Sequence, residues 1–442
     1  MKLNQLSYLT VLVFGFAFLL QSCQEDEIIT EQEILLNAKH EMNPNGKGTI
    51  KLADNNFEKL LIKLNYDSNG ITGDILKTDA DKITKLSIKS DYEIEDFSEI
   101  RHFINLTSLY CFNNNFESLD ISKNSSLTTL HCYNNEISSL DVTNNPQLTD
   151  LQCYNNNITA LDISKNPILE GLDCHNNNLT SLDVSKNPML TELYCYNNQI
   201  PSLDVSQNKL LVEFSIWNNH IETLDLSKNT RIETLNVKHN RLTQLDLSKN
   251  TKIKTLYIQN NLLTDLDLNK NTAITYLDCN KNELTSLNFS ENTALTFIDC
   301  HKNLLTSIDI SKNLILKTLI CRNNLLTDIN VSTNTILKEL DCHKNELTFL
   351  DITHNIELTR LDFHNNQFTS IDLSKNTNLT ELVCHTNKLV TLDLSENTNL
   401  TTLDCKKNPL MTCIQVNEIQ NSSIPAGWLK DLNVEYSVEP CL

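Results

Sequence analysis

Histidine and aspartate recur together in the C-terminal half of the sequence, at a spacing that could support metal chemistry. His343, His364 and His385 follow one another at intervals of 21 residues, and Asp341 and Asp362 each lie two residues before a histidine. Imidazole and carboxylate groups are ligands of zinc and other divalent metals. On stacked strands the imidazoles would be nearly parallel and would need new rotamers to converge on one ion. Three interpretations stay open: a metal site, a solvated face of mixed charge, and a pH-sensitive contact surface.

Cysteine also recurs at a regular spacing. Eleven of the fourteen cysteines occupy one position of a 21-residue pattern, called the slot below: Cys111, Cys132, Cys153, Cys174, Cys195, Cys279, Cys300, Cys321, Cys342, Cys384 and Cys405. Ile216, Val237, Ile258 and Phe363 fill it in four other copies. A position that accepts isoleucine and phenylalanine is filled by volume, and buried cysteine packs as a small hydrophobic residue. We therefore expect inert core thiols and no cofactor, with disulfides or a metal as the alternatives.

Cys413 and Cys441 stand apart from this pattern. Cys413 falls where the repeat breaks down, and Cys441 is the penultimate residue. A bridge between them would stabilise the C-terminal end by about 3–4 kcal/mol on a chain-entropy estimate. We predict this disulfide, with two unpaired thiols as the alternative.

Aromatic residues gather on either side of the slot in the first six repeats. They are Tyr110, Phe112, His131, Tyr133, Tyr154, His175, Tyr194, Tyr196 and Trp217, with Tyr257 further along. Aromatic side chains exposed on a sheet mark a contact surface, so we predict that the first nine bind a ligand. Such a patch would span about 25 Å at strand spacing, enough for a protein edge or several sugar rings. Alternatively, the rings stack on one another and stabilise the sheet as cross-strand pairs.

All these side chains belong to a sequence repeat, and the structure of that repeat must position them. From Leu106 to about Leu410 the sequence matches itself every 21 residues as LxxLxCxxNxLxxLDxSxNxx. Asparagine stands three residues after the slot in all fifteen copies, and a second asparagine column runs from Asn124 to Asn397 in fourteen. Leu130 and Cys132 should point inward while His131 points outward, since side chains alternate along a strand. A fixed period of this length predicts a solenoid whose stacked coils share one core.

This pattern resembles the leucine-rich repeat family, and within it the nested class called IRREKO, over about 70% of the chain. We expect a β-rich solenoid of about fifteen coils, with a parallel sheet on the main face and a second, shorter sheet opposite. The asparagine columns should lie at turns, because asparagine tolerates left-handed backbone and its amide can bond neighbouring coils.

An aspartate column follows the second segment of the repeat, and calcium along it is a minor alternative to a solvated row of carboxylates. Its members are Asp120, Asp141, Asp162, Asp183, Asp204, Asp225, Asp246, Asp267, Asp309, Asp351, Asp372 and Asp393. Nearer the N-terminus a helix should begin after Asp54. The segment Asp67–Gly70 is partly similar to a calcium loop but lacks the acidic spacing, so we predict a turn.

The N-terminus predicts export. A charged start, a short apolar run and Leu20-Gln21-Ser22-Cys23 indicate a lipoprotein signal peptide over residues 1–22. The end of this segment resembles a bacterial lipobox, which implies lipidation of Cys23 and anchoring at the outer membrane, on the cell surface. An ordinary secretory signal is the alternative. The remaining predicted parts are an acidic flexible tether (23–50), an N-terminal cap with a helix and a degenerate first repeat (51–105), the solenoid (106–412) and a C-terminal cap (413–442).

The composition of the chain excludes several classes of function. A net charge of −20 argues against nucleic acid, and seven scattered glycines exclude phosphate-cradling loops. Titratable residues recur in columns rather than in one pocket, so we predict no enzymatic activity. The favoured function is a cell-surface lipoprotein that binds a protein through the aromatic, concave face of the sheet, with the membrane reached only through the lipid. The alternatives are a glycan-binding adhesin and a structural spacer without a specific ligand.

Overall fold

The computed structural model describes residues 48–88 and 90–441. The predicted signal peptide, the lipidation site Cys23 and most of the tether lie outside these residues. The chain divides into two compact units, one ending at Lys82 and one comprising Ile83–Leu442. Among the described residues, no helix has the length and apolar character needed to cross a membrane.

The N-terminal unit is built from four short elements. Strand β1 (Thr49–Lys51) pairs antiparallel with β2 (Asp74–Leu76), and helices α3 (Asn55–Lys63) and α4 (Lys77–Ala80) complete it. The helix expected after Asp54 is α3. The Asp54 carboxylate caps it by accepting hydrogen bonds from the backbone N–H groups of Asn56 at 2.7 Å and Phe57 at 3.2 Å.

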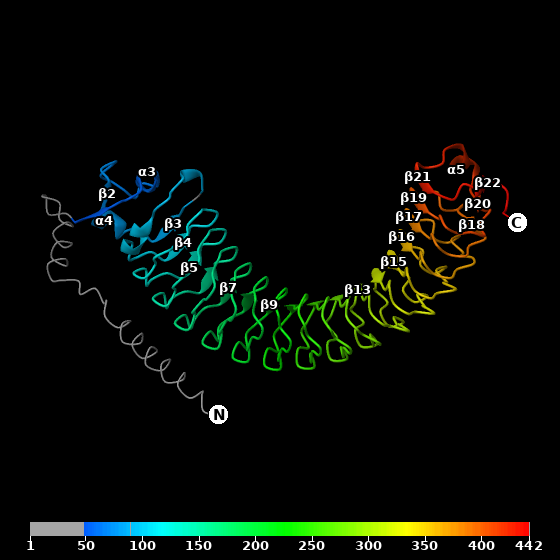
Figure 1. Ribbon diagram of the computed structural model, residues 1–442, viewed down its shortest axis with the longest axis horizontal. Coiled ribbons are helices and arrows are strands. Elements are labelled where there is room, and N and C mark those ends of the chain that lie inside the picture. Colours follow the sequence, from blue (N-terminus) through cyan, green and yellow to red (C-terminus); the bar gives the residue numbers. More distant parts are fainter. Residues whose placement is uncertain (1–47, 89, 442) are drawn as a thin grey trace, which may run out of the picture. The chain divides into compact units, whose positions relative to one another are not determined.

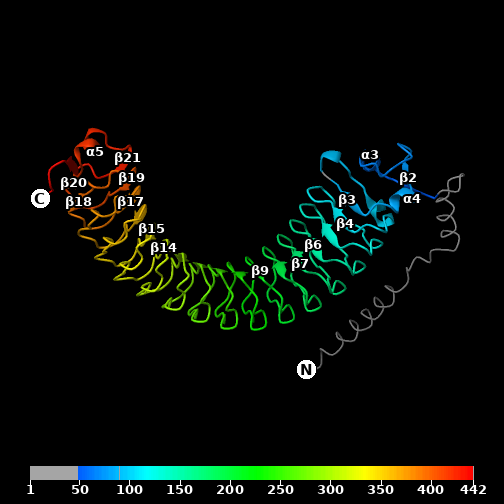
Figure 2. The same ribbon diagram turned by 180° about the vertical axis from the view of Figure 1, so that it is seen from behind.

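The second unit is a solenoid with a parallel sheet of seventeen strands among the described residues. In spatial order these are β3 (Lys85–Ser87), β4 (Ser108–Tyr110), β5 (Thr129–His131), β6 (Asp150–Gln152), β7 (Gly171–Asp173), β8 (Glu192–Tyr194), β9 (Glu213–Ser215), β10 (Thr234–Asn236), β11 (Thr255–Tyr257), β12 (Tyr276–Asp278), β13 (Phe297–Asp299), β14 (Thr318–Ile320), β15 (Glu339–Asp341), β16 (Arg360–Asp362), β17 (Glu381–Val383), β19 (Thr402–Asp404) and β21 (Gly427–Leu429). Figures 1 and 2 show these strands along the inner side of the curve of this unit.

The register of the main sheet follows the sequence period. Leu109 pairs with Leu130 and Leu130 with Leu151, so equivalent residues stand in straight files. The predicted solenoid and its main parallel sheet are confirmed. The sheet is longer than the fifteen repeats predict, because β3 precedes them and β21 follows them.

The second sheet is limited to the C-terminal end. Strands β18 (Thr391–Asp393), β20 (Cys413–Gln415) and β22 (Glu435–Ser437) form it, and one isolated bridge joins Asn288 to Asp309. Throughout the column the aspartate of this segment accepts a hydrogen bond from the backbone N–H two residues on, as Asp141 does from Thr143 at 2.8 Å. Asp393 of β18 accepts the same bond from Ser395 at 2.9 Å, so this bond turns the chain after the segment and does not by itself prevent strand pairing.

Two buried asparagine columns tie neighbouring coils together. In the first, the Asn135 Nδ2 donates to the Cys111 and Cys132 carbonyls at 3.0 Å each, and its Oδ1 accepts from the Phe116 N–H at 3.1 Å. In the second, the Asn145 Nδ2 donates to the carbonyls of Ile121 and Asn124. The Asn135 amide therefore bonds backbone groups on its own coil and on the preceding one, and the Asn145 amide bonds the preceding coil.

The left-handed backbone position is one residue earlier than we expected. Asn134, which precedes the column residue Asn135, has a φ of 54°. The same conformation recurs along the solenoid, and several copies hold other residues there: His239, Lys281, Lys302, Lys344, Thr386 and Lys407. The column asparagines are thus selected for their amide bonds, and the turn is made beside them.

The ends of the solenoid carry short helices and a covalent link. Two 3-10 helices, η1 (Ser90–Tyr92) and η2 (Ser98–His102), lie in the first coil, and α5 (Glu418–Ser422) lies near the C-terminus. Cys413 and Cys441 form the predicted disulfide, with a Cα–Cα distance of 5.8 Å. The Trp428 Nε1 donates to the Leu400 carbonyl at 3.1 Å, which fixes the last strand to the preceding coil.

Candidate ligand-binding face of the main sheet

Six of the nine predicted ligand-binding residues form one continuous stack. They occupy the position after the slot on consecutive coils: Phe112, Tyr133, Tyr154, His175, Tyr196 and Trp217. Adjacent ring centroids are 4.1 to 4.6 Å apart and adjacent planes differ by 5° to 13°. We call this file of rings the aromatic stack.

The aromatic stack is covered on its faces and open on its edges. The Lys238 Nζ lies 4.7 Å from the centroid of the Trp217 ring and closes that end with a cation–π contact. His175 is buried, and the other five rings are half-buried. The ring-on-ring packing considered above is therefore present, and it leaves outward edges and tyrosine hydroxyls for a partner.

The other three predicted residues lie in the column before the slot. Tyr110 contacts His131 edge to face at 5.0 Å, and the His131 Nε2 is 2.6 Å from the Asp150 carboxylate. The Tyr194 hydroxyl donates to Glu213. These residues flank the aromatic stack but are not part of it.

A second aromatic group lies further along the sheet, and sequence reasoning found only one of its members. Tyr257 contacts Tyr276 at 5.0 Å, and Tyr276 stacks on Phe297 at 4.3 Å. Tyr276 and Phe297 stand three residues before the slot, at the first residue of a strand, which faces outward for the same reason as the positions beside the slot. The period of two could have identified them.

Burial raises the pKa of three tyrosine hydroxyls on this face. It raises the pKa of Tyr154 to about 12, with the neighbouring Tyr133 contributing. The pKa values of Tyr194 and Tyr196 are also raised, first by burial and then, for Tyr194, by the hydrogen bond to Glu213. The Tyr194 hydroxyl already donates to Glu213, whereas the protonated hydroxyls of Tyr154 and Tyr196 can donate a hydrogen bond to a ligand at neutral pH.

In the later repeats the same columns form a buried polar network. The Asp341 carboxylate is 1% exposed, and it accepts from Arg322 at 3.0 Å and lies 2.6 Å from the His343 Nδ1. The Asp362 Oδ1 is 2.6 Å from the His364 Nδ1. This burial is a correction to the interpretation as a solvated face, since in-register neighbours shield each carboxylate and imidazole.

The three predicted histidines stack in the order His343, His364, His385, with centroids 3.9 and 4.2 Å apart. Burial opposes protonation of His343, but hydrogen bonds to Asp341 and Asp362 outweigh it and raise its pKa. Burial lowers the pKa of His364 despite its bond to Asp362. His343 and His364 therefore titrate at different pH values although their rings are stacked.

His343, Asp362 and His364 each offer one possible metal ligand atom, and these atoms lie within 4.8 Å of one another. His385 instead places its Nδ1 2.9 Å from the Thr386 hydroxyl. The Arg360 guanidinium lies 3.6 Å from the Asp362 carboxylate and also pairs with Glu339 and Glu381. Positive charge at this distance already compensates the carboxylate and competes with a metal cation.

The aspartate column has a structural role. Every member accepts a hydrogen bond from the backbone N–H two residues on, such as Asp246 from Ser248 at 2.8 Å. This bond lowers the pKa of Asp246. The column is exposed and caps the turns of the outer segment.

The slot cysteines are all buried and free. Burial raises the pKa of Cys111 to about 12, and it raises those of the others as well. Because the thiolate is the nucleophile and metal ligand, these thiols are inert in the folded chain.

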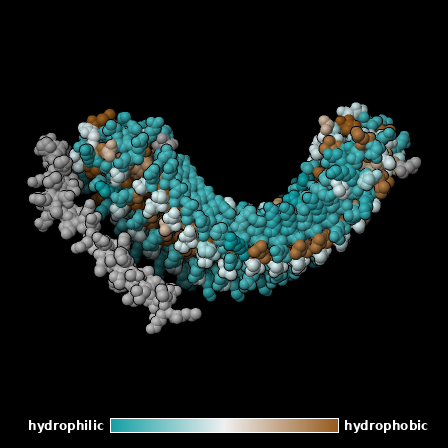
Figure 3. All heavy atoms as spheres, viewed as in Figure 1, coloured by the Kyte–Doolittle hydropathy of each residue, from teal (hydrophilic) through white to brown (hydrophobic). Residues whose placement is uncertain are grey.

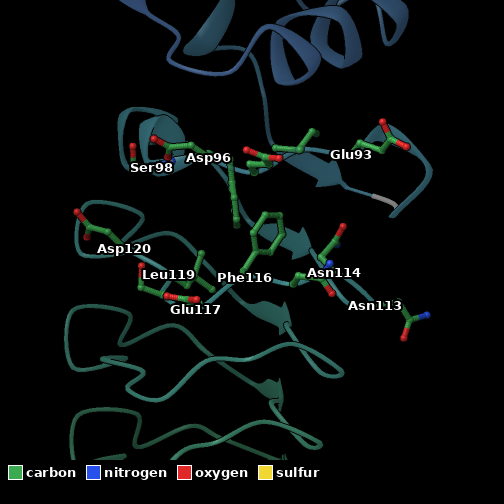
Figure 4. A pocket seen from close by; sticks show the side chains of 14 residues that line it. Glu93, Asp96, Ser98, Asn113, Asn114, Phe116, Glu117, Leu119 and Asp120 are labelled. Carbon is green, nitrogen blue, oxygen red and sulfur yellow. The ribbon is translucent and has the colours of Figure 1, made fainter.

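An open depression that the sequence did not indicate lies beside the first full coil (Figure 4). It measures about 870 Å³ and is lined by residues 93–98 and 113–120, five of them acidic: Glu93, Glu95, Asp96, Glu117 and Asp120. In Figure 4 the Phe116 ring points toward the 93–98 segment, and its centroid is 4.1 Å from that of Phe97. The depression is formed by turns after the strand, apart from the aromatic stack.

Apolar side chains are also exposed on one edge of the coils. Leu262, Leu304 and Leu325 share the position four residues after the slot and are 46%, 47% and 45% exposed. Figure 3 shows hydrophobic groups along the side of the middle coils, on a surface that is otherwise largely hydrophilic. They form an interrupted row, because Glu283 occupies the intervening coil.

In-register coils, inward leucines and buried asparagine columns define a leucine-rich repeat solenoid. Comparison with protein-family models and with curated protein sequences gives no match. Among solved structures, the functional domain of InlJ from Listeria monocytogenes, described as including a cysteine ladder, is 34% identical, with a TM-score of 0.67 over 84% of this chain and 77% of that one.

Other structures are similar in fold at lower identity. A leucine-rich repeat protein of Leptospira interrogans is 20% identical, with a TM-score of 0.68 over 82% of this chain and 97% of that one. The ectodomain of the Arabidopsis thaliana receptor kinase GASSHO1/SCHENGEN3 is 22% identical, with a TM-score of 0.66 over 77% of this chain and 46% of that one. The chain belongs to the leucine-rich repeat proteins.

Proposed function

We propose that this protein binds a protein partner through the main sheet, with the aromatic stack at the centre of the contact. The observation that carries the proposal is the file of six rings with open edges beside neutral tyrosine hydroxyls. The fold does not need rings there, because Gln259, Asn280 and Arg322 occupy the same position in later coils with the same register. Aromatic side chains on a rigid surface supply much of the binding energy in protein interfaces.

The stacked geometry favours a protein over a glycan. Recognition of a flat or cationic group by an aromatic ring uses an open ring face. Here the neighbouring ring occupies each inner face of the aromatic stack at 4.1 to 4.6 Å. Ring edges and hydroxyls remain, and these suit hydrogen bonds and packing against a protein backbone.

Two sets of substitutions test the role of the aromatic stack. Tyr133, Tyr154 and Tyr196 changed together to Phe keep the rings but remove the hydroxyls; we expect weaker binding and unchanged stability. The same residues and Trp217 changed to Ser should abolish binding in a pull-down with intact cells, and circular dichroism should report an intact fold. Tyr276→Ser, in the second aromatic group, is the matched control.

The alternatives predict other outcomes. Retained protein binding by the folded Ser variant would contradict the proposal. A glycan adhesin would give a signal on a glycan array that the Ser variant loses. A structural spacer would lose stability in the Ser variant without losing any interaction.

We further propose that the mature protein is exported and anchored at the outer membrane, on the cell surface, through lipid on Cys23, and that it belongs to the nested 21-residue repeat class. The supporting observations are the lipobox-like Leu20-Gln21-Ser22-Cys23 and the unbroken repeat period. Metabolic labelling with palmitate should mark the wild-type chain and not Cys23→Ala. Equal labelling of the two would contradict this anchor.

A further inference from the structure

The loop 67–74 of the N-terminal unit is folded around a buried carboxylate from helix α3. Glu58 is 1% exposed, and its Oε1 accepts from the backbone N–H groups of Thr72 at 2.8 Å and Gly73 at 2.6 Å. Gly70 and Gly73 both have positive φ, which lets the loop turn back toward the helix. The loop and the helix therefore share one polar centre.

Hydrogen bonds within the loop orient its other side chains. The Asp67 Oδ1 accepts from the Asn69 N–H at 3.1 Å. The Asn69 Nδ2 donates to the Asp74 Oδ1 at 2.9 Å and to the Thr72 hydroxyl at 2.6 Å. In Glu58, Asp67 and Asn69, one atom of the carboxylate or amide forms these hydrogen bonds, and the remaining oxygen of the same group does not take part in them.

Three of those remaining oxygens are buried without a hydrogen-bond partner. They are the Glu58 Oε2, the Asp67 Oδ2 and the Asn69 Oδ1. Asp67 is 6% exposed, so two carboxylates and one amide each present an unbonded oxygen away from solvent. A buried polar oxygen with no donor costs about 1–3 kcal/mol, and more when it is charged.

The charge around these oxygens is also unbalanced. The carboxylates of Glu58, Asp79 and Asp74 all lie close enough to Asp67 to repel its charge. Lys82 places its Nζ 2.8 Å from the Asp79 Oδ1, but this side chain is 75% exposed and its described ion pair is with Asp79. Among the described residues, no ion pair involves Glu58 or Asp67, and Lys82 is engaged with Asp79.

We propose that this centre binds one calcium ion through the Glu58 Oε2, the Asp67 Oδ2 and the Asn69 Oδ1, with backbone carbonyls or water completing the shell. Calcium takes oxygen ligands in flexible geometry, whereas zinc prefers nitrogen and sulfur. The proposal goes beyond the turn that the sequence predicts at Asp67–Gly70. The missing acidic ligand comes from Glu58, which lies outside the loop in sequence and so could not be found by spacing.

Calcium titration by isothermal calorimetry on the chelator-treated full chain tests the proposal. We expect one ion per chain, with a dissociation constant of about 10⁻⁵–10⁻³ M, since only two ligands are charged. Glu58→Gln and Asp67→Asn should each weaken binding at least tenfold. Asp141→Asn, in the exposed aspartate column, is the matched control and should bind as wild type.

A local measurement covers the case in which a variant does not fold. Hydrogen exchange of peptides spanning residues 58–80 in the wild-type chain should slow when calcium is added, and magnesium should have a smaller effect. Asn69→Asp, which adds a charged ligand, should bind calcium more tightly. These results do not depend on the aromatic stack.

Two outcomes would overturn the proposal. In the first, the wild-type chain binds no calcium, and Asp67→Asn makes the chain more stable than the wild type in the presence of chelator. That result would indicate that Glu58 and Asp67 share a proton and bind no ion. The other is calcium binding that survives in folded Glu58→Gln and Asp67→Asn but is lost in Asp141→Asn, which would place the ion on the aspartate column.

Discussion

At the scale of single residues, an outward-facing side chain of the solenoid can be buried by large side chains at the equivalent positions of the neighbouring coils. Asp278 shows the effect: it is 8% exposed although it lies on the outward face of β12. Burial, and then the charge of Asp299, raises the pKa of Asp278 to about 6. Its partner Asn280 donates from Nδ2 to the Asp278 Oδ1 at 2.5 Å.

This raised pKa predicts a pH dependence of stability. The folded chain holds the Asp278 proton up to about pH 6, whereas the unfolded chain releases it near pH 3.9. The stabilisation is therefore present below pH 4 and lost as the pH rises to 6. Asp278→Asn should remove this slope and raise the free energy of unfolding at pH 7 by about 1–3 kcal/mol. Urea unfolding between pH 4 and 7 measures it.

The control for this prediction is Asp246→Asn on the exposed column. The pKa of Asp246 is lowered by the N–H of Ser248, so the slope between pH 4 and 6 should persist in that variant. A slope that is equally steep in Asp278→Asn and in the wild type would contradict the prediction.

At the scale of elements, the asparagine columns do more for the fold than strand pairing on the outer side. The Asn240 Nδ2 donates to the carbonyls of Ile216 and Val237 at 3.1 Å each, and its Oδ1 accepts from the Ile221 N–H at 3.0 Å. With a further bond to the Lys238 carbonyl at 3.3 Å, the buried Asn240 amide holds four backbone groups on two coils.

Removal of this amide should leave those backbone groups unsatisfied. Asn240→Ala is expected to cost about 2–4 kcal/mol, since each buried unsatisfied group costs about 1–3 kcal/mol and the coils relax in part. The outward Asn236→Ala should change stability by less than about 0.5 kcal/mol. Equal denaturation midpoints for the two variants would refute the role of the column.

The repeated elements also show which features of the fold and of the candidate site could be predicted from the sequence. The period was enough to predict the coils, the inward leucines and the buried thiols, because every repeat restates the same alternation. It could not separate ring packing from ligand binding in the aromatic stack, since both need outward rings at strand spacing. It also missed the contribution of Glu58 to the 67–74 loop, because helix and loop meet only in the folded unit.

At the scale of the whole repeat unit, stability depends on closing the ends of an otherwise open stack. The Cys413–Cys441 disulfide closes a segment with a sequence separation of 28 at the C-terminal end. Cys441→Ser should lower stability by about 3–4 kcal/mol on the chain-entropy estimate.

Denaturation with and without reductant measures this effect. Reductant should lower the midpoint of the wild type and leave that of Cys441→Ser unchanged, because the slot cysteines are already free. A reductant effect of the same size in both chains would show that another bond is responsible.

Site-specific photo-crosslinking tests most directly whether the aromatic face of the main sheet contacts a protein. A benzoylphenylalanine at Gln152, which lies outward on β6 beside the aromatic stack, should crosslink to a discrete protein on intact cells. The same probe at Ser185, on the outer segment, should not. Crosslinking from Ser185 alone, or from neither site by a folded and correctly exported chain, would contradict the proposed binding face.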